Sequence, residues 1–87
     1  MYALEIRESV DEIFRKLAKK DKVSFEYVKK NIEEIRESPY HFKPLKNPLQ
    51  NCRRVHIGNF VLVFSINENK KTVVIERYKH HDEVYLP

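Results

Sequence analysis

Residues 60–66 form a nearly continuous apolar run, FVLVFSI, which is typical of a strand buried at the centre of a sheet. The Gly58-Asn59 pair before this run can supply the positive φ of a two-residue turn. Residues 52–57 alternate as an earlier strand, and residues 72–77 (TVVIER) follow the polar turn at 67–71 as a later one. The second half of the chain therefore predicts an antiparallel meander of three strands.

The first half of the chain has helical spacing instead. Residues 1–6 alternate as a short strand, and apolar residues then recur every three or four positions through residues 9–20 and 24–37. Ser9 opens a capping box for the first helix, and Ser24 can cap the second. Two helices joined by so short a break are expected to form a hairpin.

The element order β-α-α-β-β-β predicts a small α+β fold, with one domain over residues 1–87. We expect an antiparallel sheet packed on the helical hairpin, with the first strand beside the meander. Residues 38–51, which hold three prolines, are expected to be a loop. A chain of 87 residues leaves no room for a second core.

Composition excludes several classes of protein. The single cysteine excludes an intramolecular disulfide and a CxxC site, and the single glycine excludes a Gly-rich phosphate loop. No apolar run approaches the ~18 residues of a membrane span. Residues 1–7 also lack a basic leader followed by an apolar stretch. We therefore expect a cytoplasmic protein that enters no membrane.

The formal net charge of +4 arises in the middle of the sequence. Residues 1–37 carry nine basic and nine acidic side chains, and residues 68–87 carry four of each. The segment between them has no acid but holds four cations, Lys43, Lys46, Arg53 and Arg54. Such a basic segment is the footprint of a polyanion, most simply a nucleic acid. A solvated face, or a surface for an acidic protein partner, would give the same charge.

Alternation along the strand at 52–57 decides which face carries this charge. Arg54 and His56 lie on one face, and Val55 and Ile57 on the other. Burying the two apolar side chains under the helices leaves Arg54 and His56 on an open, basic face. Arg53 is expected to point inward, or to escape at the start of the strand.

A metal site is not expected from the sequence. Adjacent His80 and His81 cannot easily bind one ion from an extended chain, and the sequence has neither a Cys pair nor an HxxxH helix. Cys52 is expected to be a small buried hydrophobe. We therefore predict no metal and no other cofactor.

Metal-free cleavage of RNA needs a group that takes a proton from the 2′-hydroxyl, a group that protonates the leaving 5′-oxygen, and cations for the extra phosphate charge. Histidine, with an ordinary pKa of ~6.5, suits the proton transfers. Alternatively, the histidines are surface residues without a role and Tyr85 only anchors the C-terminus. The candidate catalytic residues are Arg54, His56, Lys79, His81 and Tyr85, and the candidate RNA-binding residues are Lys43, Lys46, Arg53, Arg77 and His80.

Several motifs resemble the signature half of the RelE toxins of the RelE/ParE superfamily. They are the Leu-Lys pair at 45–46, the hairpin RVHIGNF at 54–60, the apolar strands at 61–66 and 73–75, and HDEVY at 81–85. The segment SPYHFKPL at 38–45 and the helical hairpin before it also fit the family. The resemblance spans essentially the whole chain and implies the RelE/ParE-like, microbial-RNase-like fold.

The resemblance implies the toxin of a type II toxin–antitoxin system that cleaves messenger RNA in the ribosomal A site through the 2′-hydroxyl. The implied partners are a RelB-like antitoxin, the ribosome and mRNA, with no small-molecule ligand. By position, Arg54 and His56 match residues that contact the scissile phosphate. Tyr85 matches a tyrosine that stacks or orients near the cleaved bond, and Lys79 or His81 falls where relatives carry an arginine.

Val61 departs from the family pattern, because many relatives carry an arginine at this position. The change favours the ParE branch, whose members share the fold but inhibit DNA gyrase. Arg54, His56, His81 and Tyr85 together favour the nuclease. A catalytically inactive module that binds RNA or a partner through the basic sheet is a third interpretation.

Overall fold

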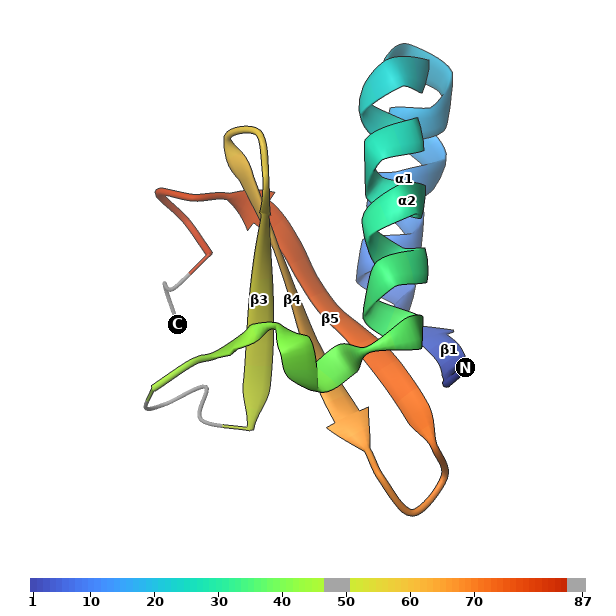
Figure 1. Cartoon of the computed structure of the whole chain (residues 1–87). Coiled ribbons are helices and arrows are strands. Elements are labelled where there is room, and N and C mark those ends of the chain that lie inside the picture. Colours follow the sequence, from blue (N-terminus) through green and yellow to red (C-terminus); the bar gives the residue numbers. More distant parts are fainter. Residues whose placement is uncertain (47–50, 85–87) are drawn as a thin grey trace.

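The computed structural model describes residues 1–46 and 51–84. Figure 1 shows a helical pair standing beside a twisted sheet. The elements in chain order are β1 (Ala3–Ile6), α1 (Glu8–Lys20), α2 (Lys22–Glu37), the 3-10 turn η1 (Pro39–His41), β2 (Lys43–Pro44), β3 (Cys52–Ile57), β4 (Phe60–Asn67) and β5 (Thr72–His80).

The strands form one sheet in the order β1-β5-β4-β3-β2. The antiparallel meander of β3, β4 and β5 is confirmed, and β5 runs three residues further than predicted. β2 lies inside the predicted loop and pairs with β3. β1 is parallel to β5, so the sheet is mixed and the prediction of a wholly antiparallel sheet is wrong. Alternation in a sequence indicates which face a side chain takes, but it carries no information on strand direction.

Asp21 is the only residue between the two helices, which contact each other as a hairpin. Asp21 caps α2, because its Oδ1 accepts a hydrogen bond of 3.0 Å from the backbone nitrogen of Ser24. The hydroxyl and backbone bonds from Ser24 lower the pKa of Asp21. The prediction that Ser24 is the cap is therefore wrong. α1 begins at Glu8, with Arg7 in the N-cap position. The prediction of a capping box that begins at Ser9 is therefore also wrong.

The main core lies between the helices and one face of the sheet. This helix-facing side also receives Val55 and Ile57 from β3, as alternation predicts. The buried residues are Val10 and Phe14 of α1, Val28, Ile32 and Ile35 of α2, Leu62 and Phe64 of β4, and Val73, Ile75 and Tyr78 of β5. We call the opposite side of the sheet the outer face.

A bulge in β5 decides where its basic side chains point. Val63 of β4 pairs with Arg77, whereas the next residue, Phe64, pairs with Ile75, so Glu76 is an extra residue in the ladder. Ile75 faces the helices before the bulge and Tyr78 faces them after it. Arg77 therefore projects from the outer face, and so does Lys79 two residues on.

A small apolar cluster covers the middle of the outer face. Val61 and Val63 of β4 are fully buried there under Val84, with Leu45 and Cys52 packed at the margin. Val84 reaches this position because the chain turns after β5, where its backbone nitrogen donates to the carbonyl of His80. The face that was predicted to be open is therefore open only around this cluster.

Within the described residues, no helix is both long enough and apolar enough to cross a membrane.

Candidate functional site

Cross-strand pairing gathers cations on the outer face. Lys43 of β2 lies opposite Arg54 of β3, and Arg54 lies opposite Val63, whose other partner is Arg77. Residues that are directly opposite each other project from the same face of a sheet. The predicted residues Lys43, Arg54 and Arg77 thus share one row across the sheet.

A second row lies nearer the tip of the β3–β4 hairpin. His56 is opposite Val61, and Val61 is opposite Lys79. The side chains of His56 and Lys79 are both exposed. Neighbouring strands are ~4.8 Å apart, so the backbones of the two residues are ~10 Å apart, with the buried Val61 between them. The exposed ends of His56 and Lys79 can therefore approach one phosphate group from opposite sides of this buried strand.

Arg54 and His56 are in direct contact. Nη1 of Arg54 lies 3.0 Å from Nδ1 of His56 and 3.3 Å from Nε2. A guanidinium group can only donate, so a ring nitrogen of His56 is the acceptor in this contact, and the tautomer decides which of the two it is. The pair combines a permanent cation with a nitrogen that has a lone pair.

His81 joins the second row at the hairpin tip. Its backbone nitrogen donates to the carbonyl of Asn59 at 3.0 Å, and its Nδ1 lies 3.2 Å from the same oxygen. Because a carbonyl only accepts, Nδ1 carries the proton in this contact, and Nε2 is directed elsewhere. His56, Lys79 and His81 are therefore the exposed predicted residues around this tip.

Three other predicted residues lie outside the second row. Arg53 lies at the start of β3 and is only partly buried. Its Nη1 donates to the carbonyl of Phe42 at 2.6 Å, and its guanidinium lies 5.1 Å from the ring centre of Tyr40. His80 packs edge-on against Phe60 on the helix-facing side. Lys46 is exposed beyond the short β2 strand.

Arg77 has a structural contact as well as its place on the outer face. Its Nη1 donates to the carbonyl of Val84 at 2.8 Å, which holds the C-terminal turn over the apolar cluster. Tyr85, a predicted catalytic residue, lies outside the described residues and stays a prediction.

Glu76 is a polar residue of the outer-face edge that sequence reasoning missed. Burial opposes its ionisation, but hydrogen bonds from Arg7 and Ser65 outweigh burial and lower its pKa. Cys52 lies opposite Ser65, and burial raises the pKa of its thiol, in line with its prediction as a small hydrophobe. Period-2 alternation could not place Glu76, because it is the bulged residue.

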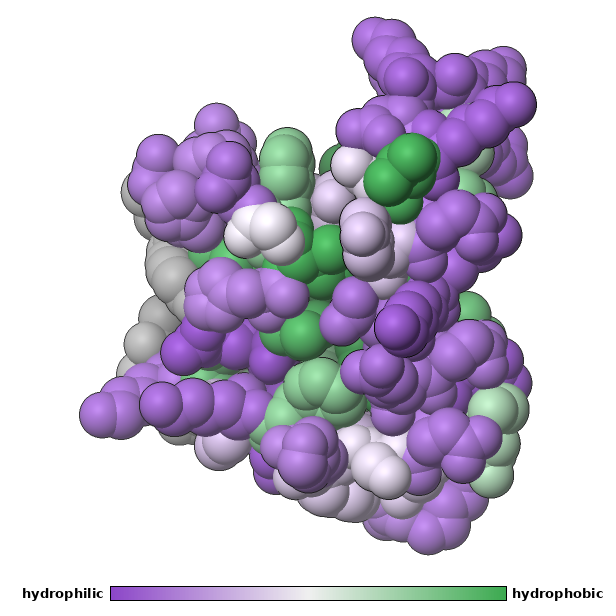
Figure 2. Space-filling view, turned by 45° about the horizontal axis from the view of Figure 1, so that its top comes forward, coloured by the Kyte–Doolittle hydropathy of each residue, from purple (hydrophilic) through white to green (hydrophobic). Residues whose placement is uncertain are grey.

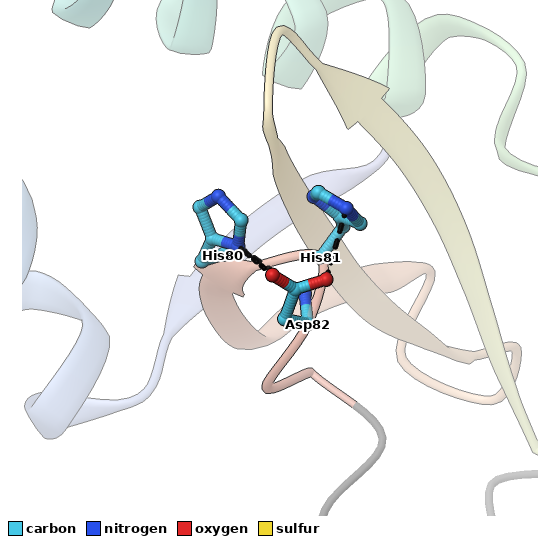
Figure 3. A group of neighbouring side chains, drawn as sticks. All are labelled: His80, His81 and Asp82. Carbon is cyan, nitrogen blue, oxygen red and sulfur yellow. Dashed lines mark hydrogen bonds and ion pairs between the residues drawn. The ribbon is translucent and has the colours of Figure 1, made fainter.

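His80, His81 and Asp82 form a compact group of metal-ligand types. One ligand atom of each lies within 4.8 Å of the others, and Figure 3 shows the two rings on either side of the Asp82 carboxylate. The sequence argument against metal assumed an extended chain at this point. That assumption is wrong, since β5 ends at His80 and the chain turns through residues 81–84.

A groove of about 910 Å³ lies between the helices and the hairpin tip, on the side opposite the outer face. Three of its lining side chains are large, apolar and exposed, namely Ile13, Tyr27 and Phe60. Lys16 and Lys20 also line it. Figure 2 shows hydrophobic residues at the bottom of a hollow that hydrophilic residues surround. This is a second surface able to receive a partner.

The sequence matches a family model described as "ParE toxin of type II toxin-antitoxin system, parDE" over residues 2–85. It is 46% identical over 86 residues to "Putative toxin RelE4" of Methanocaldococcus jannaschii, which covers 98% of this chain and 92% of that protein. The isolated E. coli RelE toxin superposes with a TM-score of 0.75 at 26% identity, over 98% of this chain and 92% of that one.

A chain of the archaeal RelE-RelB complex from Pyrococcus horikoshii OT3 has the same fold. Its TM-score is 0.72 at 17% sequence identity, over 95% of this chain and 98% of that chain.

Proposed function

Because the chain belongs to the RelE/ParE superfamily of type II toxin–antitoxin toxins, we propose that it is a ribosome-dependent endoribonuclease that cleaves messenger RNA in the A site. The reaction is attack of the 2′-hydroxyl on the adjacent phosphorus, which expels the 5′-oxygen and leaves a 2′,3′-cyclic phosphate. The chemistry needs proton transfer and charge stabilisation from the chain's own residues.

The observation that carries this proposal is the second row of the outer face. His56 and Lys79 stand on either side of the buried Val61, His81 lies beside them at the hairpin tip, and Arg54 contacts His56. A proton acceptor and several cations within reach of one phosphate group are what transesterification of RNA requires.

Each residue has a role in this proposal. The imidazole of His56 accepts the 2′-hydroxyl proton, and Arg54 orients the ring and adds positive charge. Lys79 stabilises the negative charge that develops on the phosphate oxygens. His81 protonates the leaving 5′-oxygen. The cations Lys43 and Lys46 would hold the neighbouring RNA backbone, and Tyr85 would stack on an unpaired base.

The proposed inhibitor is a RelB-like antitoxin with an acidic, amphipathic segment. The groove beside the hairpin tip offers such a segment the exposed apolar side chains of Ile13, Tyr27 and Phe60. Lys16 and Lys20 would pair with its acids. The archaeal relative whose solved structure is a RelE–RelB complex supports a partner of this kind.

Primer extension on ribosomes stalled with a defined codon in an empty A site tests the proposal. We expect breaks within that codon, and fragments that end in a 2′,3′-cyclic phosphate. A 2′-deoxy nucleotide at the scissile position should abolish the break, because the attacking oxygen is gone. His56→Gln and Lys79→Ala should each lower the single-turnover rate about 100-fold.

Lys19→Ala is the matched control, since Lys19 is an exposed cation on α1 and away from the outer face. It should cleave at the wild-type rate. Intact message with the wild-type protein, or equal rates for all three variants, would contradict the proposal.

The second candidate function is inhibition of DNA gyrase. It is favoured by Val61, which stands where the family resemblance places an arginine in many members and is fully buried in the middle of the outer face. A supercoiling assay with purified gyrase distinguishes the two functions. Inhibition of supercoiling together with intact message would select the gyrase function, whereas cleavage without inhibition would exclude it.

A further inference from the structure

We propose that His80, His81 and Asp82 bind one divalent transition-metal ion, such as Zn²⁺ or Cu²⁺, at the end of β5. The site uses Nδ1 of His80, Nε2 of His81 and the carboxylate of Asp82. Solvent completes the coordination, because all three residues have solvent access at the surface.

The spacing of the donor atoms fits one ion. Nδ1 of His80 lies 3.4 Å from Oδ2 of Asp82, and Nε2 of His81 lies 3.0 Å from Oδ1. Ligands at 2.0–2.2 Å from a tetrahedral ion are roughly 3.4 Å apart. All three ligand atoms lie within 4.8 Å of one another, so rotation of the side chains can bring them to a common centre.

Both imidazoles already direct the required nitrogen toward Asp82. The Nδ1 proton of His81 is held by the carbonyl of Asn59, and its Nε2 faces Oδ1 of Asp82, where a bound ion would take the place of a proton. A backbone carbonyl that accepts from the far nitrogen is the usual support of a metal-binding histidine. Nδ1 of His80 accepts from the backbone nitrogen of Asp82 at 3.3 Å, so its lone pair also points to this side. A bound ion would replace that contact.

The donor set selects the class of metal. Two imidazoles with one carboxylate suit Zn²⁺, Cu²⁺ and Ni²⁺, whereas Mg²⁺ prefers oxygen ligands in octahedral geometry. Among the immediate neighbours, exposed Lys79 and Glu83 carry opposite charges. The Asp82 carboxylate therefore supplies the local charge that favours a cation.

An ion at this site would occupy Nε2 of His81 and so withdraw it from proton transfer. This consequence rests on the proposed nuclease function. The metal-binding experiment below does not depend on nuclease activity. A failure to bind metal would therefore leave the nuclease proposal standing, and a failure to cleave RNA would leave the metal site standing.

Calorimetric titration of untagged protein with ZnCl₂ tests the site. We expect saturation at one ion per chain and an affinity at least about tenfold lower in His80→Ala, His81→Ala and Asp82→Asn. His41→Ala and Cys52→Ser are controls that remove ligand types elsewhere, and both should bind as the wild type does. MgCl₂ should give no comparable signal.

A second measurement protects against a variant that fails to fold. Addition of CuCl₂ to ¹⁵N-labelled wild-type protein should broaden amide signals around residues 59 and 80–83 first. Broadening centred on His41, Cys52 or His56 would overturn the proposal. So would the absence of stoichiometric Zn²⁺ binding, or equal affinity in His81→Ala.

Discussion

Glu68 connects three side chains that come from separate parts of the chain. It accepts hydrogen bonds from Tyr2 before β1, from Tyr40 in η1 and from Lys71 across the β4–β5 turn. The backbone of Lys71 has a positive φ of 49° at this turn. One surface residue thus joins the N-terminus, the start of the long connection and the last turn of the meander.

This arrangement predicts a pH dependence of stability. Bonds from Lys71, Tyr40 and Tyr2 lower the pKa of Glu68 from 4.5 to about 2. A carboxyl whose pKa is lower in the folded state adds stability above its unfolded pKa and loses it as the pH falls toward the folded value. We expect Glu68→Gln to lower the urea midpoint at pH 7. The difference from the wild type should shrink between pH 4.5 and about 2.

Comparing the two proteins at every pH cancels the other carboxyl groups, which they share. A difference in urea midpoint that stays constant down to pH 2 would show that Glu68 contributes no ionisation-linked stability.

Among the elements, β5 has the greatest effect on the site. Its bulge at Glu76 turns Arg77 and Lys79 from the helix-facing side to the outer face. The carboxylate of Glu76 is anchored by Arg7 Nε at 2.9 Å and by the hydroxyl of Ser65 at 2.7 Å. The irregular point of the strand is therefore fixed by polar contacts on both sides.

We predict that Glu76→Gln lowers the free energy of unfolding by about 1–2 kcal/mol, because half-buried charge-assisted hydrogen bonds become neutral ones. Urea unfolding at pH 7 measures this loss. Ser65→Ala should lower the free energy of unfolding by less in the Glu76→Gln background than in the wild type, since the two side chains share a hydrogen bond.

Glu34→Gln is the matched control for this substitution, as an exposed glutamate on α2. A loss for Glu76→Gln no larger than that of the control would mean that the bulge does not depend on its carboxylate.

Sequence patterns predicted the helices, the meander and the face of β3 well, because each follows from local periodicity. Three features could not be predicted in this way, because they depend on contacts between residues that are far apart in the sequence. They are the parallel partner of β1, the bulge at Glu76 and the return of Val84 over Val61. The group of His80, His81 and Asp82 escaped for a related reason, since the turn after β5 leaves no strong turn signal in the sequence.

The whole molecule presents two surfaces on opposite sides of one sheet. The proposed nuclease residues His56 and Lys79 lie on the outer face near the hairpin tip, and the apolar groove lies on the side of the helices. The hairpin tip borders both, because His56 and Phe60 also line the groove. A partner in the groove could therefore block RNA at the tip without covering the rest of the outer face.

This division predicts that Tyr27→Glu weakens antitoxin binding about tenfold or more while leaving RNA cleavage unchanged. Tyr27 is 58% exposed in the groove, and a carboxylate there would repel an acidic partner. Isothermal titration with the antitoxin measures the affinity.

Val23→Glu is the control, since Val23 is 66% exposed on the same helix but does not line the groove. Equal affinities for the two variants would place the antitoxin elsewhere.

The edges of the sheet have a consequence for how the chain behaves in a crowded solution. β2 has only two residues and ends in Pro44, whose nitrogen has no hydrogen to offer a further strand. β1, at the opposite edge, has only four. Within the described residues, β1 and β2 themselves therefore offer a neighbouring copy few consecutive backbone groups with which to extend the sheet. Short edges of this kind protect a small, strand-rich chain from aggregating with itself whenever it stands alone.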